Sequence, residues 1–134
     1  HPGKNPFEVI ELSYGPQTLW PDHCIQGSPG AQFHPDLNIA HAQLIVRKGG
    51  NRQVDSYSAF TEADQTTPTG LAGNLRERGI DTLFLCGLAL DFCVAWTVLH
   101  ARREGFATYV VLDACRAIDT AGSCAAAMAM TASC

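Results

Sequence analysis

Two side chains in this sequence have the chemistry for nucleophilic catalysis, Lys48 and Cys93. Lys48 follows the short apolar run AQLIVR, and Cys93 follows the apolar run DTLFLC and the tight turn GLALD. If both runs are strands of a parallel sheet, their carboxyl ends meet at one edge, where open α/β sheets bind ligands. The first turn of a helix and a nearby ammonium both favour negative charge on sulfur. We therefore expect Cys93 to be a nucleophile that faces one crevice with Lys48.

The turn before Cys93 adds a second element of such a site. Backbone N–H groups where a strand turns into a helix have no helical partners, so they are available to an oxyanion formed when a thiolate attacks a carbonyl. The alternative is that Cys93 is a small buried apolar residue, as free cysteines often are. Asp91, just ahead of the helix, is open to two interpretations, orienting the turn or capping the helix, of which capping is the expected one.

The remaining cysteines do not indicate a metal or disulfide framework. None belongs to a C-x-x-C pair, which argues against a zinc ribbon or a small disulfide scaffold and favours reduced thiols. They are Cys24, Cys86, Cys115, Cys124 and Cys134.

Residues 1–41 are expected to form an irregular segment that carries metal-binding or substrate-binding groups. Gly and Pro recur throughout it, and long loops are usually functional. His23, within the string LWPDHC, is a candidate metal ligand, although its spacing matches no compact metal motif. The polar loop at 55–57 is open to two interpretations, turn chemistry or substrate contact.

Residues 42–134 are expected to form a β-α-β-α-β-α core within a single domain over 1–134. The first strand spans 42–47, and the following helix runs from Thr69 as N-cap to Gly79 as C′. DTLFLCG is expected to be a strand covered on both faces. Alternation of strands and helices with short connections predicts a parallel sheet with helices on its faces.

The last helices and strand complete this alternation. CVAWTVLHARREG is expected to be a helix that ends at Gly105, with His100 on its charged side. ATYVVLD is expected to be a strand, ACRAID a connector, and 120–134 a helix of small residues that packs closely on the sheet.

Composition excludes several classes of protein. The chain has 134 residues, 46% hydrophobic and 16% charged, and a formal net charge of −4, which is typical of a globular domain and unlike a nucleic-acid binder. No apolar run reaches the roughly 18 residues of a membrane span, and no signal peptide is recognisable. We expect a cytoplasmic protein that binds neither nucleic acid nor membrane.

Several long motifs in a fixed order resemble the nicotinamidases of the isochorismatase-like cysteine hydrolases. They are LWPDHCIQGSPGAQFHPDL, VRKG, VDSYSAF, TGLAGNLRERGID, GLALDFCVAWT and GFATYVVLDACRAID. The resemblance covers nearly the whole chain and implies a three-layer α/β/α fold with a mostly parallel, doubly wound sheet. It also implies hydrolysis of nicotinamide to nicotinate and ammonia through a cysteine thioester, in NAD salvage.

The resemblance also implies roles for particular residues. Cys93 would be the nucleophile and Lys48 the lysine of a Cys-Lys-Asp triad. Ala89 would follow a cis peptide bond and form the oxyanion hole together with Cys93. His23 would be one ligand of a divalent metal ion (Zn, Fe or Mn), whose other ligands lie outside this chain. The pyridine pocket would be lined by Trp20, Tyr57 and Phe60.

The sequence departs from the family pattern in two ways. Leu90 stands where the family usually has Thr. The family's first strand, which carries the triad Asp and the other metal ligands, would lie upstream of His1, and its last strand would lie beyond Cys134. We therefore expect a fragment, incomplete at both ends of its sheet and weakly active or inactive alone. An exposed sheet edge would favour association with a second copy.

Two alternatives remain open at this point. The first is another amide or carbamoyl hydrolase of the same group, with the Cys-Lys pair but a different pocket and metal. The second is a non-catalytic relic or interaction module that retains the crevice without the reaction.

Overall fold

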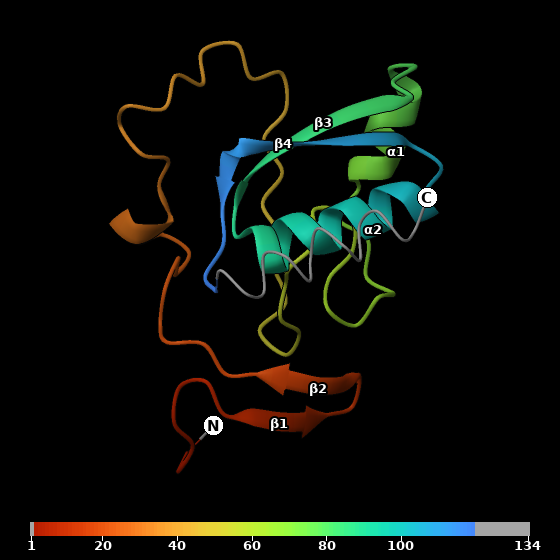
Figure 1. The fold of residues 1–134 in the computed structure, drawn as a ribbon. Helices are drawn as coiled ribbons and strands as arrows, with labels where there is room; N and C mark the ends of the chain where they lie inside the picture. Colours follow the sequence, from red (N-terminus) through yellow and green to blue (C-terminus); the bar gives the residue numbers. More distant parts are fainter. Residues whose placement is uncertain (1, 120–134) are drawn as a thin grey trace. The chain divides into compact units, whose positions relative to one another are not determined.

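The computed structural model describes residues 2–119 (Figure 1). The chain divides into two compact units, His1–Ile45 and Val46–Cys134. The division falls close to the predicted boundary after residue 41. The helix expected over 120–134 lies outside the described residues, as do Cys124 and Cys134.

The first unit contains an antiparallel hairpin where we expected irregular chain. Strand β1 (Val9–Leu12) pairs with β2 (Gly15–Thr18), with Val9 opposite Thr18 and Leu12 opposite Gly15. Gly15 has a φ of 121° directly after the two-residue turn, a conformation that favours glycine. The expectation was wrong because Gly and Pro also occur within a two-stranded ribbon, where a proline needs no donor on its outer edge.

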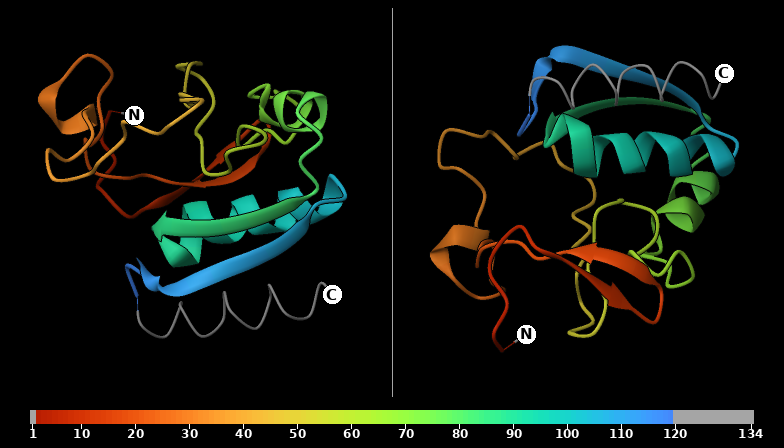
Figure 2. Two further views of the ribbon diagram at one scale, coloured as in Figure 1. Left: turned by 90° about the horizontal axis from the view of Figure 1, so that it is seen from above. Right: turned by 60° about the horizontal axis from the view of Figure 1, so that its bottom comes forward.

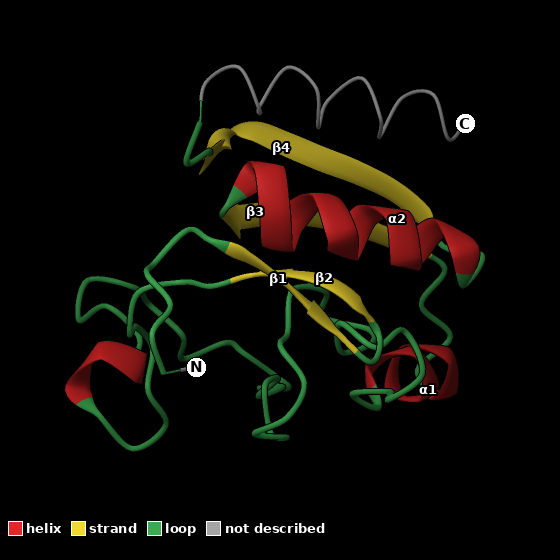
Figure 3. Cartoon of the chain, turned by 90° about the horizontal axis from the view of Figure 1, so that it is seen from below, coloured by secondary structure: helices red, strands yellow, loops and turns green. Residues whose placement is uncertain are grey.

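From β2 to α1 the chain is otherwise mostly loop, with one 3-10 turn, η1 (Pro29–Ala31) (Figure 3). The strand expected over 42–47 is not formed, and Leu44 and Ile45 are exposed. A strand requires a hydrogen-bonded neighbour, and no strand among the described residues pairs with this run. Apolar composition alone could not supply that partner.

Helix α1 (Leu71–Glu77) ends as the sequence predicts. Gly79 has a φ of 68°, and its N–H donates to the Arg76 carbonyl oxygen, so Gly79 is the C′ residue. At the other end the N-cap is Gly70, one residue later than predicted. The Thr69 hydroxyl still accepts a hydrogen bond from the Leu71 N–H at 3.2 Å.

The sheet of the second unit is a parallel pair, as predicted. Strand β3 (Thr82–Leu88) lies beside β4 (Ala107–Arg116), with Thr82 opposite Ala107 and an irregularity between Leu85 and Gly87. β4 therefore continues through part of the predicted connector. Helix α2 (Ala95–Arg103), preceded by the π-helical turn η2 (Leu90–Val94), runs along the pair (Figure 2).

Helix α2 covers one face of this pair and forms its hydrophobic core. Val94, Ala95 and Val98 are buried together with Leu90 and Cys115, and the half-buried side chains of β3 and β4 pack on them. The other face is exposed, with Phe84 stacked on Tyr109 at 5.2 Å between ring centroids. The expectation that β3 is covered on both faces was therefore wrong for the described residues, since α2 covers only one.

His100 is also placed differently from the prediction. It is buried on α2, its Nδ1 lies 2.7 Å from the Thr61 hydroxyl oxygen, and its ring lies edge-on to Trp96. Burial lowers the pKa of His100, Arg103 lowers it further, and Glu104 opposes the shift. Helical spacing alone did not reveal that a threonine from a distant loop would meet this face.

The described part of the chain holds no helix with the length and apolar character needed to span a bilayer.

Candidate active site

The second unit brings Lys48 and Cys93 together. The Lys48 Nζ lies 3.7 Å from the Cys93 Sγ and donates a hydrogen bond of 2.7 Å to the Ser56 carbonyl oxygen. Both side chains are half-buried. The thiol and the ammonium group selected from the sequence are therefore in direct contact, although the strand expected to carry Lys48 is absent.

Cys93 sits in the turn η2, which connects β3 to α2. The Leu88–Ala89 peptide bond is cis, as the resemblance implied. The Ala89 carbonyl oxygen accepts hydrogen bonds from the N–H groups of Phe92 and Val94, at 3.1 and 3.0 Å. The second of these is an i→i+5 bond, a pattern that occurs frequently at functional sites. Ala89 and Cys93 thus belong to one tightly wound turn.

A threonine on the next helical turn contacts the backbone of Cys93. The Thr97 hydroxyl donates to the Cys93 carbonyl oxygen at 2.6 Å and accepts from the Ala59 N–H at 3.0 Å. Thr97 was not among the site residues expected from the sequence. The available signal was its position four residues after Cys93, from which a threonine hydroxyl can reach back to the carbonyl oxygen one turn earlier.

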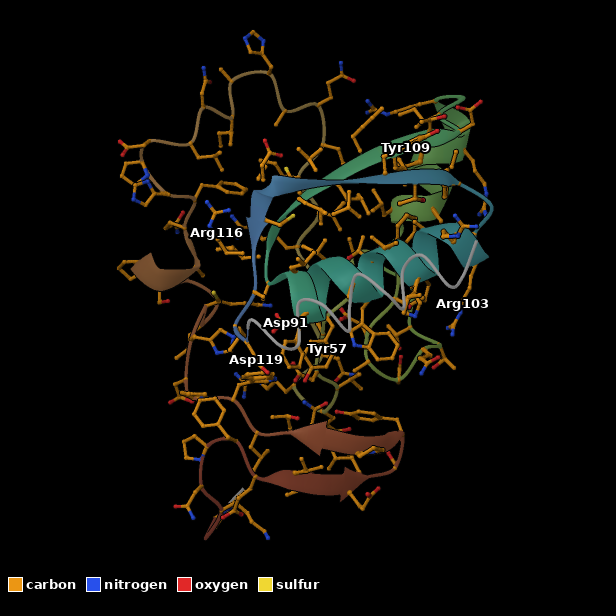
Figure 4. The ribbon with its side chains drawn as sticks, viewed as in Figure 1. Tyr57, Asp91, Arg103, Tyr109, Arg116 and Asp119 are labelled. Carbon is orange, nitrogen blue, oxygen red and sulfur yellow. The ribbon has the colours of Figure 1, made fainter. Side chains whose placement is uncertain are left out.

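Asp91 does not cap the helix as expected. Its carboxylate accepts hydrogen bonds from the Ile118 N–H, at 3.1 Å to each oxygen, and from the Asp119 N–H at 2.9 Å. Figure 4 shows Asp91 and Asp119 close together at the amino-terminal end of α2. Asp91 therefore joins the turn that carries Cys93 to the segment after β4, a long-range contact that sequence spacing does not show.

A buried carboxylate also supports the residue after Lys48. Glu62 is only 6% exposed, and its Oε1 accepts a hydrogen bond of 3.0 Å from the Gly49 N–H. Its other carboxylate oxygen is buried without a partner. Nothing in the sequence distinguished Glu62 from the acidic residues of a polar loop.

Tyr57 and Phe60, the two aromatic residues expected in the substrate pocket, differ in their surroundings. Tyr57 is half-buried, and its ring lies 6.1 Å from that of Phe92, next to Cys93 in sequence. Phe60 is 2% exposed and packs with Ala101 and Phe106 in a hydrophobic core. The structure therefore gives Phe60 a packing role and leaves Tyr57 as the pocket candidate of the two.

Trp20 and His23 belong to the first unit. The Trp20 ring makes an edge-to-face contact with Phe7, with centroids 6.0 Å apart. His23 is exposed, and its Nδ1 lies 2.6 Å from the Pro21 carbonyl oxygen. Because a carbonyl oxygen can only accept, Nδ1 is the donor in this contact, and Nε2 is the ring nitrogen through which His23 would bind a metal ion.

The described residues do not complete a metal site around His23. Catalytic zinc sites use about three protein ligands, and nowhere within residues 2–119 do three His, Cys, Asp or Glu side chains gather in a ligating arrangement. His23 alone therefore fits one ligand position and no more.

The model of the isochorismatase domain family matches residues 12–134. This chain belongs to the isochorismatase family. It is 59% identical over 123 residues to the nicotinamidase of Acinetobacter baylyi, a match that covers 92% of this chain and 58% of that protein. The chain thus spans little more than half of the relative's length. The family expected from the sequence motifs is confirmed.

Solved structures agree with this membership. The nicotinamidase of Acinetobacter baumanii superimposes with a TM-score of 0.95 at 61% identity, over 99% of this chain and 65% of that one. PnC1 from L. infantum, in complex with nicotinate, superimposes with a TM-score of 0.83 at 42% identity, over 87% of this chain and 58% of that one. A Pyrococcus horikoshii pyrazinamidase in complex with zinc superimposes with a TM-score of 0.73 at 32% identity, over 87% of this chain and 60% of that one. The α/β fold of the isochorismatase family is therefore confirmed for this chain.

Proposed function

We propose that this protein hydrolyses nicotinamide to nicotinate and ammonia in the salvage of pyridine nucleotides, with Cys93 as the nucleophile. The observation that carries the proposal is the contact of 3.7 Å between the Lys48 Nζ and the Cys93 Sγ in the turn after β3. The similarity to enzymes named nicotinamidase supports the choice of substrate.

In the first half of the reaction, the sulfur of Cys93 attacks the carboxamide carbon. A carbon–sulfur bond forms and the carbonyl oxygen takes up negative charge. The N–H groups of Ala89 and Cys93, in the turn that follows the cis bond, are proposed to donate to this oxygen. The carbon–nitrogen bond then breaks, and the proton lost by the thiol leaves with the amino group as ammonia. The product of this half-reaction is a nicotinoyl thioester on Cys93.

In the second half, water hydrolyses the thioester. The water oxygen bonds to the carbonyl carbon, the carbon–sulfur bond breaks, and one proton returns to the sulfur of Cys93. Nicotinate is released, so one amide and one water give one acid and one ammonia. Lys48, fixed by the Ser56 carbonyl, stabilises negative charge on the sulfur in both halves.

The pyridine ring is proposed to bind against an aromatic side chain, and Tyr57, half-buried beside Phe92, is the candidate that the geometry favours. Trp20 stays a candidate on the sequence motifs alone. A divalent metal ion is proposed as a cofactor because this chain is similar to a pyrazinamidase whose structure is in complex with zinc. His23 would be one ligand. When bound, such an ion would supply Lewis acidity and a place for the ring nitrogen or a water molecule.

The decisive experiment compares two cysteine variants in the full-length gene product. Cys93→Ala should abolish ammonia release from nicotinamide, whereas Cys86→Ala, which removes an exposed thiol of β3, should leave it unchanged. Rapid acid quenching followed by peptide mass analysis should find the nicotinoyl adduct on the peptide that contains Cys93. Full turnover by Cys93→Ala would refute the mechanism, and no turnover of nicotinamide by the unmodified enzyme would refute the substrate.

A further inference from the structure

One short segment, residues 56–62, contacts Lys48 directly and is joined to Cys93 through Thr97. On the lysine side, the Ser56 carbonyl oxygen accepts from the Lys48 Nζ at 2.7 Å. On the cysteine side, the Ala59 N–H donates to the Thr97 hydroxyl, which donates to the Cys93 carbonyl oxygen. The two reactive groups come from distant parts of the sequence, so the separation of their atoms depends on what joins them.

We propose that Thr97 is a positioning residue for the nucleophile. Its hydroxyl connects the backbone of Cys93 to the segment 56–62 and thereby sets the distance and angle between the Cys93 sulfur and the Lys48 ammonium. The inference rests on the proposed function, because it concerns the same reaction. It assigns a role to a side chain that touches neither the substrate nor the reacting atoms.

The direction of the two hydrogen bonds is fixed by chemistry. A backbone N–H can only donate, so the Thr97 oxygen is the acceptor from Ala59 at 3.0 Å. The hydroxyl has one proton, and a carbonyl can only accept, so that proton goes to the Cys93 carbonyl oxygen at 2.6 Å. A threonine that only bonds back along its own helix is ordinary. Here the same hydroxyl also holds a segment that lies 38 residues earlier in the sequence.

The segment 56–62 is itself firmly anchored, which is necessary if it is to act as a fixed support. Ser58 and Phe60 are each 2% exposed, and Phe60 packs in the core with Ala101 and Phe106. The Thr69 hydroxyl donates to the Ala59 carbonyl oxygen at 2.6 Å. Other contacts also join this segment to α2, such as Thr61 with His100, but the Thr97 hydroxyl is the group that reaches the backbone of Cys93 itself.

The lysine side has an equivalent link through Glu62. Its buried carboxylate accepts from the N–H of Gly49, the residue directly after Lys48, at 3.0 Å. The peptide group that follows Lys48 and the side-chain nitrogen of Lys48 are thus held at two points of the same segment. Glu62 offers an independent place to test whether this segment sets the geometry of the pair.

The experiment uses the full-length gene product with three threonine variants. Thr97→Val keeps the shape and removes the hydroxyl, Thr97→Ser keeps the hydroxyl, and Thr108→Val is the matched control. The Thr108 hydroxyl also donates to a backbone carbonyl, that of Phe106, at 3.0 Å, but it lies on β4. The measurements are kcat and KM for nicotinamide, and the rate at which iodoacetamide alkylates Cys93, followed by peptide mass analysis with exposed Cys24 as an internal reference.

We expect Thr97→Val to lower kcat by about tenfold or more with KM changed less than about twofold, because misplacement of reacting groups by fractions of an ångström is costly. The alkylation rate of Cys93 relative to Cys24 should change in the same variant. Thr97→Ser should restore both values to within about twofold of the unmodified enzyme, and Thr108→Val should leave both unchanged.

Several results would overturn the inference. They are an unchanged kcat in Thr97→Val, equal losses in Thr97→Ser and Thr97→Val, or a loss in Thr108→Val as large as in Thr97→Val. If Thr97→Val does not fold, the test moves to Glu62. Glu62→Gln keeps an acceptor for Gly49 and should retain kcat, whereas Glu62→Leu should lose it, and equal kcat values in these two would overturn the inference as well.

This design separates the inference from the proposed function. If the unmodified enzyme does not hydrolyse nicotinamide, the proposed substrate fails. The alkylation ratio of Cys93 to Cys24 across the Thr97 variants still reports on positioning, and an unchanged ratio would then overturn the inference by itself.

Discussion

The Lys48 ammonium is held between two groups, the Ser56 carbonyl oxygen at 2.7 Å and the Cys93 sulfur at 3.7 Å. A cation fixed at this distance stabilises negative charge on the sulfur, and the thiolate is the form that reacts with alkylating agents. The pair therefore makes a prediction that does not depend on the substrate.

We predict that Lys48→Met slows the alkylation of Cys93 by iodoacetamide by about three- to tenfold at neutral pH, because the half-buried ammonium no longer stabilises the thiolate. Peptide mass analysis over a time course measures the rate for each cysteine. Lys4→Met is the control, since Lys4 lies in the first unit and pairs with Glu8. An equal Cys93 rate in the two variants would remove Lys48 from the chemistry of the thiol.

The sequence was sufficient to find this pair but not to explain how it is held. Lys48 and Cys93 were selected because each follows an apolar run, and the structure brings them together although only the second run, β3, is a strand. Thr97 and Asp91 act through backbone groups that are distant in the sequence. Such contacts depend on tertiary packing, which residue type and spacing do not encode.

The same limit applies to burial. The ends of α1 and α2 follow from Gly79 and Gly105, because a local φ requirement can be read from the sequence. Whether a face is covered cannot be read in that way. Phe84 on β3 is exposed, whereas Phe60 in a polar loop is buried in the core. The burial of each residue depends on which other elements pack against it.

A second prediction concerns the chain of 134 residues alone. Within residues 2–119 no carboxylate forms an ion pair with Lys48, and a cysteine nucleophile normally needs a general base nearby. We expect residues 1–134 to release ammonia from nicotinamide at least about a hundredfold more slowly than the full-length gene product, given the size of general acid–base contributions. Equal rates in a coupled ammonia assay would contradict this expectation.

A third prediction concerns Asp91, whose carboxylate accepts from the backbone N–H groups of Ile118 and Asp119. Asp91→Ala should lower the free energy of unfolding by about 1–3 kcal/mol, because charge-assisted hydrogen bonds are lost. Asp91→Asn should lower the free energy of unfolding less, since its amide oxygen can still accept a hydrogen bond from these N–H groups. Urea denaturation followed by circular dichroism measures both, with the exposed Asp22→Ala as the control. A loss no larger than that of Asp22→Ala would show that the contact contributes little.

A fourth prediction concerns pH. The pKa of His100 in the folded protein is lower than its usual value of 6.5 because the ring is buried. The unfolded chain therefore binds more protons as the pH falls, so the stabilisation present above about pH 6.5 is lost on acidification. The midpoint temperature of thermal unfolding should be lower at pH 5.5 than at pH 7.5. His100→Gln should make this difference smaller.

The control for His100 is His41→Gln, which changes an exposed histidine of the first unit. It should leave the pH dependence of the unfolding midpoint as it is in the unmodified protein. An identical dependence in His100→Gln and His41→Gln would show that protonation of His100 does not limit stability, despite its contact with Thr61.

The final prediction separates the two aromatic residues of the loop after Lys48. Phe60 is 2% exposed and packs on Ala101 and Phe106, so Phe60→Leu should cost about 1–1.5 kcal/mol of unfolding free energy, as in other core substitutions of similar volume. It should leave KM for nicotinamide nearly unchanged, because the ring is enclosed by core side chains. Tyr57→Leu, at the half-buried ring beside Phe92, should instead raise KM severalfold with a smaller effect on stability. If Phe60→Leu folded fully and raised KM as much as Tyr57→Leu, Phe60 would belong to the substrate pocket.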